Sequence, residues 1–227
     1  MREHSGRLRL AVSVLVFALL VLPAAPVVGA QDGTGEEPPL PDPGLLPGSP
    51  FYFVKQLLER VRLALARSTE DRLVLMARFL EVRLAEAEAL AGRGKESLVE
   101  RTMERYRELA ERAALEVERA SAQGRDITEA LLALERATRR SREVLGQVLE
   151  RVPDQARGAV RLALEASDIG REVCLRVMER IREGLAPGRP EVIDRFLSRL
   201  RGMLPGPGMG HEEEQTQGQD EGQGGGN

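Results

Sequence analysis

The sequence predicts an all-α protein, an elongated antiparallel bundle of helices with coiled-coil-like hairpins. Apolar residues recur at alternating steps of three and four, and short breaks rich in Gly or Pro separate the periodic stretches. Aromatic residues make up only 3% of the chain, so the core must consist of Leu, Val and Ala, which suits close helix packing. We expect this bundle domain over residues 49–204.

The first thirty residues have the pattern of a secretory signal peptide. Three arginines precede an apolar run over 10–22, and the small residues 28–30 stand before Gln31. The run is too short to span a bilayer comfortably, and Pro23 ends it. We therefore expect cleavage after Ala30 and an exported protein, secreted or held in the cell envelope, without membrane contact after cleavage.

Two segments without hydrophobic periodicity flank the bundle. Residues 31–48 are rich in Pro and Gly, and residues 205–227 are rich in Gly, Gln and acidic side chains. Neither segment can bury enough apolar surface to order itself, so both are expected to be disordered. The formal net charge is −3, and the acidic residues of the two segments leave the helical body mildly basic.

The first two helices have recognisable start signals. Ser49 is the expected N-cap of the first helix and Pro50 its first residue, where a missing N–H is tolerated. Ser68 opens a capping-box pattern over 68–71 before the second helix. One apolar stripe is predicted along the first helix, formed by Val54, Leu57, Leu58, Val61 and Leu65.

The second and third helices are predicted to fold back as an antiparallel hairpin around the Gly-rich break over 92–94. Their seams comprise Leu73, Ala77, Leu80, Leu84, Ala87 and Ala91 in the second helix, and Val99, Met103, Tyr106, Ala110, Ala113, Val117 and Ala120 in the third. The same heptads could pair with a second copy of the chain as a homodimer. The regular Gly breaks favour the hairpin within one chain.

The fourth and fifth helices continue the pattern on either side of Pro153, which forces a boundary or a kink. Asp126 is a candidate N-cap, and Gly170 predicts a bend near 168–170. Thr138 and Ser141 stand on the fourth seam, either bonded back to the preceding turn or turned to solvent. The other seam residues are Ile127, Leu131, Leu134, Leu145, Val148 and Val152, then Ala156, Val160, Ala163, Ser167, Cys174, Val177 and Ile181.

A short last helix follows Pro190. Its apolar stripe, formed by Val192, Ile193, Phe196, Leu197 and Leu200, stands opposite Arg195, Arg199 and Arg201. Docking of the stripe onto the bundle is the prediction, because about ten residues are short for a helix that lies on an anionic membrane surface. The membrane surface is the alternative.

No pattern in the sequence indicates catalysis, a cofactor or a metal site, and we expect no enzyme. Glu86 and Arg83 belong to a run of mixed charge over 78–88, and a similar run covers 101–112. Both are interpreted as solvated helix faces held by i,i+4 pairs. His211 precedes three Glu residues in the acidic tail, where a solvating role is favoured over weak cation binding. Motifs typical of zinc proteases, phosphate loops and hydrolases do not occur.

The single cysteine and the abundant arginine limit the partners. Cys174 is expected to be buried on its seam, and an exposed thiol that pairs two chains is the alternative. Lys55 and Lys95 are the only lysines among 33 basic residues, and Glu is interleaved with the arginines, which favours ion pairing along helix faces. Because no dense basic run and few aromatic residues occur, nucleic acid is not an expected partner.

Three stretches carry a resemblance to a known family. Residues 47–55 (PGSPFYFVK), 83–90 (RLAEAEAL) and 152–156 (VPDQA) with its continuation to Ser167 resemble the bacterial helical domain of unknown function 5667, over roughly residues 47–170. Members are typically exported or membrane-linked proteins, some tied to anti-sigma-type sequences, and no activity is established for them. The resemblance therefore implies a bacterial envelope setting and supplies no catalytic residue.

The aromatic cluster Phe51, Tyr52 and Phe53 is the candidate binding site in this aromatic-poor chain. It is interpreted first as a lid that packs the first helix onto the bundle, and second as an anchor for a partner. The predicted function is a non-enzymatic exported protein that binds another envelope protein or polymer through charged helix faces. The alternative is an envelope sensor or chaperone-like module that receives apolar segments in a groove between helices.

Overall fold

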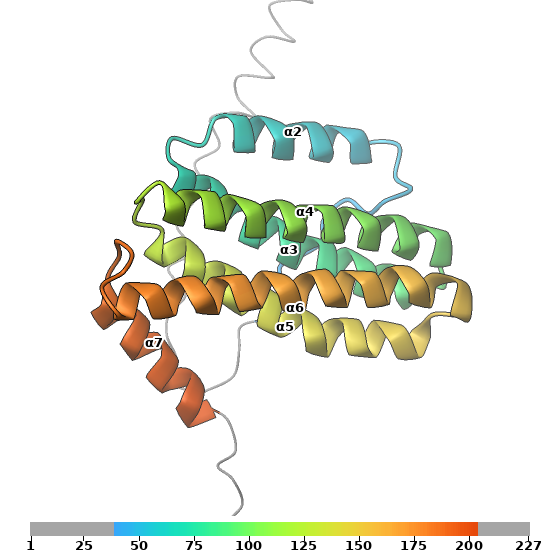
Figure 1. Cartoon of the computed structure of the whole chain (residues 1–227). Helices are drawn as coiled ribbons and strands as arrows, with labels where there is room; N and C mark the ends of the chain where they lie inside the picture. The colour runs from blue at the N-terminus through green and yellow to red at the C-terminus, as the bar shows by residue number, and fades with distance from the viewer. Residues whose placement is uncertain (1–38, 204–227) are drawn as a thin grey trace, which may run out of the picture. The chain divides into compact units, whose positions relative to one another are not determined.

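The computed structural model describes residues 39–203 and shows an all-α bundle of six helices in that range, as predicted (Figure 1). The helices are α2 (Tyr52–Ala64), α3 (Thr69–Ala91), α4 (Glu96–Ala122), α5 (Thr128–Arg151), α6 (Asp154–Arg182) and α7 (Pro190–Met203). Within the described residues, none of the helices is both long and apolar enough to cross a bilayer. The predicted signal peptide, the tail over 205–227 and His211 lie outside them.

The predicted breaks occur between the long helices. The Ser68 hydroxyl accepts a hydrogen bond from the backbone N–H of Asp71 at 2.9 Å, which confirms the cap of α3. Gly94 and Gly124 adopt φ of 61° and 68°, the left-handed conformation that glycine favours after a helix. Pro153 separates α5 from α6, so the boundary expected there is confirmed.

Two helices begin later in the chain than the sequence predicts. The first helix begins at Tyr52 and not at Pro50, because Ser49 belongs to a preceding turn in which its carbonyl accepts from the Tyr52 N–H at 3.0 Å. Ile127, not Asp126, occupies the cap position of α5. The Asp126 carboxylate still accepts hydrogen bonds from the backbone N–H of Thr128, at 3.0 Å, and from the Thr128 hydroxyl. Desolvation alone would raise the pKa of Asp126, but these two hydrogen bonds act against it and lower that pKa.

The four long helices are connected in an order that the sequence does not reveal. α3 packs against α4 and α5, and α6 packs against the same two helices, so that α4 and α5 occupy opposite corners (Figure 1). Each short connection reverses the chain direction, so α3 with α4 and α5 with α6 are antiparallel neighbours, while α3 with α5 and α4 with α6 run in parallel. α4 and α5, although consecutive in the chain, are therefore not neighbours in the bundle.

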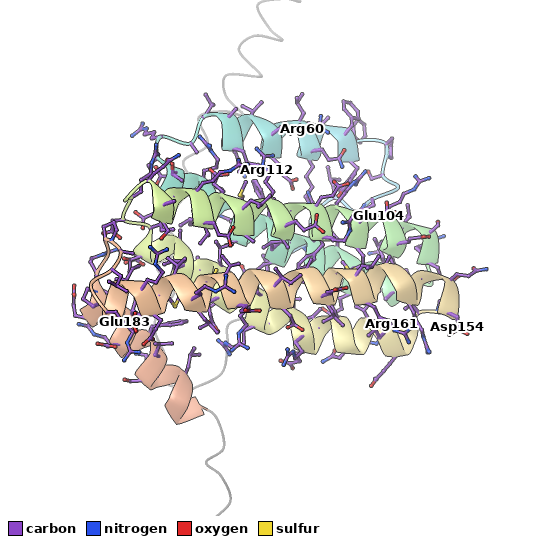
Figure 2. The ribbon with its side chains drawn as sticks, viewed as in Figure 1. Arg60, Glu104, Arg112, Asp154, Arg161 and Glu183 are labelled. Carbon is purple, nitrogen blue, oxygen red and sulfur yellow. The ribbon has the colours of Figure 1, made fainter. Side chains whose placement is uncertain are left out.

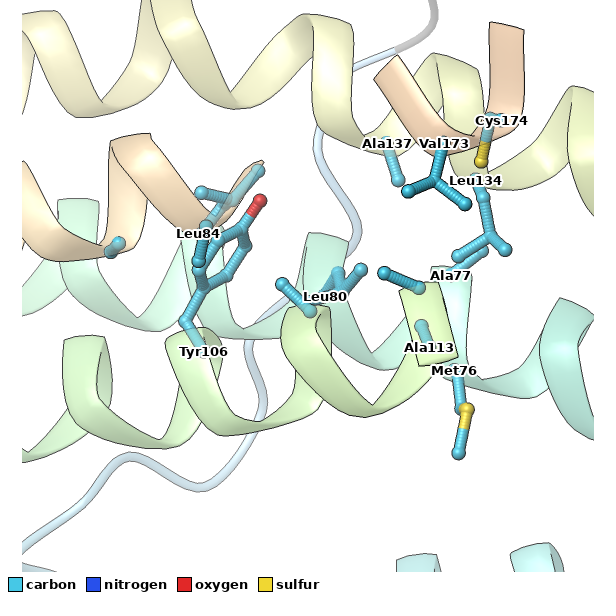
Figure 3. Close-up of a cluster of buried hydrophobic side chains, with 14 of the residues drawn as sticks. Met76, Ala77, Leu80, Leu84, Tyr106, Ala113, Leu134, Ala137, Val173 and Cys174 are labelled. Atoms are coloured by element: carbon cyan, nitrogen blue, oxygen red, sulfur yellow. The ribbon is translucent and has the colours of Figure 1, made fainter. Parts of the chain in front are cut away.

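The seams of α3, α4, α5 and α6 form the hydrophobic core. All of the seam residues predicted for these four helices are buried within one chain. Figure 3 shows Leu80 and Leu84 of α3 beside Tyr106 of α4, with Leu134 and Cys174 farther along the same core. The heptad seams therefore pack against one another within one chain, as the Gly breaks between the helices predicted.

A buried hydroxyl cluster joins three of these helices. The Tyr106 hydroxyl donates to the Ser167 hydroxyl at 3.1 Å, and Ser167 in turn donates to the Ser141 hydroxyl. Thr138 and Ser141 donate to backbone carbonyls one turn earlier, at 2.8 and 2.6 Å. Back-bonding, and not exposure to solvent, therefore satisfies the two polar seam residues.

Gly170 lies inside an uninterrupted α6, and the bend expected there is not seen (Figure 1). A Cβ at this position would stand 3.8 Å from the Thr138 side chain, an ordinary van der Waals distance. We expect Gly170→Ala to raise the free energy of unfolding by about 0.5–1 kcal/mol in chemical denaturation, because alanine loses less conformational entropy in a helix. Gly170→Leu should lower it, since only a methyl group fits, and a stabilised Gly170→Leu variant would contradict this reading.

Cys174 is buried in α6, as predicted. Burial, with a contribution from the Glu135 carboxylate, raises the pKa of the thiol to about 12. We therefore expect the native protein to be inert toward a thiol-specific reagent at neutral pH and to react only after unfolding. Rapid modification of the folded protein, or an oxidised dimer on a non-reducing gel, would show that the thiol is accessible.

α7 docks onto the bundle by its apolar side, as expected. Ile193 is fully buried, while Val192, Phe196 and Leu197 pack against the core beside it. Arg195 is exposed on the other side. The helix is longer than the ten residues predicted, and it contacts α5 and α6.

Candidate functional site

The aromatic cluster at the start of α2 is divided between the bundle and the solvent. Tyr52 is buried with 6% of its surface exposed, whereas Phe51 and Phe53 are 63% and 64% exposed. Consecutive helical residues point about 100° apart, so three aromatic residues in a row cannot all face the bundle. The lid interpretation is therefore confirmed for Tyr52 alone, and the side chains of Phe51 and Phe53 are exposed to solvent.

A charged cluster under α2 holds this helix on α3. Glu86 of α3 is fully buried, and its carboxylate accepts from Arg83 at 2.9 Å, from Lys55 at 2.6 Å and from the Tyr52 hydroxyl at 3.0 Å. Arg83 also pairs with Glu59 of α2. Three residues of α2 therefore dock through polar contacts, and we call these five side chains the docking cluster.

Further contacts outside the docking cluster hold α2 on the bundle. The Arg105 guanidinium of α4 stands 5.5 Å from the centre of the Tyr52 ring, within cation–π range. Lys55 Nζ also donates to the Pro43 carbonyl at 2.5 Å, and Leu40 packs against the core. Residues 39–48, part of the segment expected to be disordered, therefore lie against the bundle without forming a helix.

The docking cluster corrects the interpretation of the charge run over 78–88. Glu86 and Arg83 are buried and bridge two helices, whereas the run was expected to be a solvated face. One feature of the sequence indicates this burial: Glu86 directly precedes the seam residue Ala87 and therefore lies next to the core. The second run, over 101–112, does carry an exposed pair between Arg107 and Glu111 at 2.7 Å.

Burial in the docking cluster changes two ionisation equilibria. Desolvation of Tyr52, opposed by Arg83 and assisted by Glu86, raises the pKa of its hydroxyl to about 12. Although desolvation opposes the shift, Glu86 and Glu59 raise the pKa of Arg83. Arg83 therefore stays charged, and the Tyr52 hydroxyl stays protonated as a hydrogen-bond donor to Glu86.

The protein is expected to lose stability as the pH rises above 10. Burial also raises the pKa of Tyr106, the only other tyrosine, and an unfolded tyrosine ionises near pH 10. Between pH 10 and about 12 the unfolded chain therefore loses protons that the folded chain retains, and this favours unfolding. Ultraviolet absorbance should show no tyrosinate in the folded protein at pH 10, and Tyr52→Phe should weaken the alkaline loss. Ionisation of the folded protein at pH 10 would contradict the prediction.

The apolar stripe of α2 points away from the bundle, opposite to the docking cluster. Of the α2 hydrophobic residues, Tyr52 is buried and Leu63 packs against the core, while the others belong to neither group. The predicted stripe exists, but it faces the solvent and not the bundle. Three of its residues are only half-buried and two are exposed: Val54, Leu58 and Val61, and Leu57 and Leu65. We call Phe53, Val54, Leu57, Leu58, Val61 and Leu65 the outer stripe.

Arginines border the outer stripe. Arg60 and Arg62 are exposed on its two sides, and no ion pair of the described residues includes either of them. A shallow groove of about 240 Å³ beside the helix is lined by Arg60, Arg72 and Arg112 with Leu63 and Ala64. Figure 2 shows Arg60 on α2 and Arg112 on α4 on this part of the molecule. The stripe therefore has a positively charged border.

A second groove, of about 250 Å³, lies between α2 and the α3–α4 pair. Besides Leu63, Phe79 and Leu109, its lining is polar, with Glu59, Arg60, Arg83, Arg105, Glu108 and Gln56. Charged walls of this kind do not suit an extended apolar segment. In the part of the chain that the structure describes, no group of three His, Cys, Asp or Glu side chains is placed to hold a metal ion.

Comparison with known proteins finds one family whose profile matches part of the chain. No curated protein and no solved structure matches it. Residues 44–155 match the profile of the family described as Domain of unknown function (DUF5667), which spans α2 to α5 and ends at the second residue of α6. The match confirms the resemblance to the domain of unknown function 5667 over residues 47–155, while residues 156–170 of the expected range lie outside the match.

Proposed function

We propose that this is an exported, non-enzymatic binding module of the bacterial cell envelope, and that it binds another envelope protein through α2. The observation that carries the proposal is the outer stripe: an amphipathic helix sits on the bundle by its polar side and presents its apolar side outward. Contiguous exposed apolar surface of this kind marks an interaction site in soluble proteins. The signal-peptide pattern of residues 1–30 supports an interaction outside the cytoplasm.

The outer stripe replaces the charged helix faces as the centre of the proposed interface. Many arginines on the outer surfaces already have acidic partners on their own or a neighbouring helix, as in the Arg176–Glu172 pair at 2.7 Å and the Arg142–Asp168 pair at 2.8 Å. Such surface pairs offer a partner little free charge. The polar lining of the groove under α2 likewise supports this proposal over the chaperone-like alternative.

Photo-crosslinking in the producing cell tests the proposal. A photoreactive amino acid would replace Leu57, which is 56% exposed on the outer stripe, or Leu162, which is 53% exposed on α6 and serves as a matched control. We expect a discrete crosslinked protein from position 57 and none from position 162. Equal labelling at the two positions, or no protein adduct at position 57, would refute α2 as the docking surface.

A further inference from the structure

We infer that the partner of α2 is an acidic amphipathic helix, which packs its apolar side along the outer stripe and places carboxylates beside Arg60 and Arg62. The inference rests on the proposed function, because it specifies the chemistry of the partner that α2 would bind. Its basis is the combination of an unpartnered apolar stripe with unpaired cations at both of its edges.

The outer stripe has the geometry that a helix requires. Phe53, Leu57 and Val61 follow one another at intervals of four residues, and Val54, Leu58, Val61 and Leu65 follow at intervals of four and three. A second helix with the same periodicity can insert its side chains between these rows. α2 has 13 residues, about 20 Å of length, which matches three to four turns of a partner helix.

The charges at the stripe select an acidic partner. The one acidic residue of α2, Glu59, is turned inward and paired with Arg83, so the helix presents no carboxylate to a partner. Arg60 and Arg62 flank the stripe, and Arg60 shares its groove with Arg112. A partner helix that carries Glu or Asp beside its apolar stripe would neutralise these cations, whereas a basic helix would be repelled.

Two other occupants fit the observations less well. The acidic tail over 211–227 contains no apolar residue that could cover the stripe. A second copy of α2 offers no outward carboxylate to Arg60 or Arg62.

Two matched peptides test the inference on the mature chain. Each is a synthetic helix of about 18 residues with Leu at heptad positions a and d, and positions e and g carry Glu in one peptide and Lys in the other. We expect the Glu peptide to bind about tenfold or more tightly than the Lys peptide at low salt, by fluorescence anisotropy, because like charges repel across an interface. Added salt should reduce the difference.

Substitutions in the protein locate the effect. Leu57→Ala should weaken binding of the Glu peptide about tenfold, as expected for a central apolar contact. The double variant Arg60→Glu/Arg62→Glu should reverse the preference toward the Lys peptide. Arg161→Glu on α6, an exposed arginine far along the chain from α2 (Figure 2), should change neither. Hydrogen exchange of the α2 amides confirms that each variant keeps the helix docked.

The outcomes separate the inference from the proposed function. Equal affinity for both peptides, each lost in Leu57→Ala, would overturn the acidic partner and leave α2 as a docking surface. Absence of peptide binding together with absence of crosslinks from position 57 would overturn both. Binding to anionic vesicles or self-association of the mature chain, abolished by Leu57→Ala, would also overturn the acidic helix and identify a membrane or a second copy as the occupant.

Discussion

Replacing Glu86 with alanine is expected to release α2 from the bundle while α3 to α6 remain folded. Glu86 is the acceptor at the centre of the docking cluster. Its loss leaves Arg83 buried beside only Glu59, removes the acceptor of the Tyr52 hydroxyl and leaves Lys55 without its carboxylate partner. Removing one member of a buried ion pair costs about 3–5 kcal/mol. Since α2 contributes one buried side chain, its remaining contacts cannot offset that loss.

Hydrogen exchange and circular dichroism measure this release. The amides of α2 should lose protection, and the helical signal should fall by no more than the 13 residues of α2, while the cooperative unfolding of the core persists. Glu111→Ala serves as the control, because this exposed residue pairs with Arg107 on the surface, and it should cost less than about 1 kcal/mol. Retained protection of α2 in Glu86→Ala would show that apolar contacts, and not the docking cluster, hold the helix.

The second large effect is expected from a pair of leucines. Leu84 of α3 is fully buried beside Tyr106 (Figure 3), and Leu84→Ala should lower the free energy of unfolding by about 2–5 kcal/mol through lost burial and a cavity. Leu57→Ala on the outer stripe should change it by less than about 0.5 kcal/mol. Chemical denaturation of both variants gives the comparison. A large loss in Leu57→Ala would mean that the stripe belongs to the core.

Hydrophobic periodicity predicted the core of the four long helices because each of them has one buried side. The residues spaced three and four apart from Leu73 to Ile181 are buried where the pattern placed them. Periodicity does not state which helices become neighbours. The parallel packing of α4 on α6 depends on how the side chains of several helices fit together, and the spacing of residues along one chain does not show this.

The candidate site was harder to predict for a related physical reason. The pattern showed that Val54, Leu57 and Val61 share one side of α2, but a pattern cannot tell whether that side faces the bundle or the solvent. Which side of α2 faces the bundle is decided by Glu86 and Arg83 of α3, two charged residues that the sequence pattern predicted on a solvated face. Ion pairs between elements distant in the sequence leave no periodic signal, so spacing could indicate that Glu86 lies beside the core but could not identify its partners in α2.

The placement of α4 and α5 at opposite corners determines when the domain can be completed during synthesis. A nascent chain that ends before residue 154 contains α3, α4 and α5, yet α6, the second helix that packs against both α4 and α5, has not been synthesised. The hydroxyls of Tyr106 and Ser141 would then lack Ser167, their partner on α6. The newly made polypeptide therefore cannot close its core until about four-fifths of it has been translated, which lengthens the interval in which its apolar seams stay exposed.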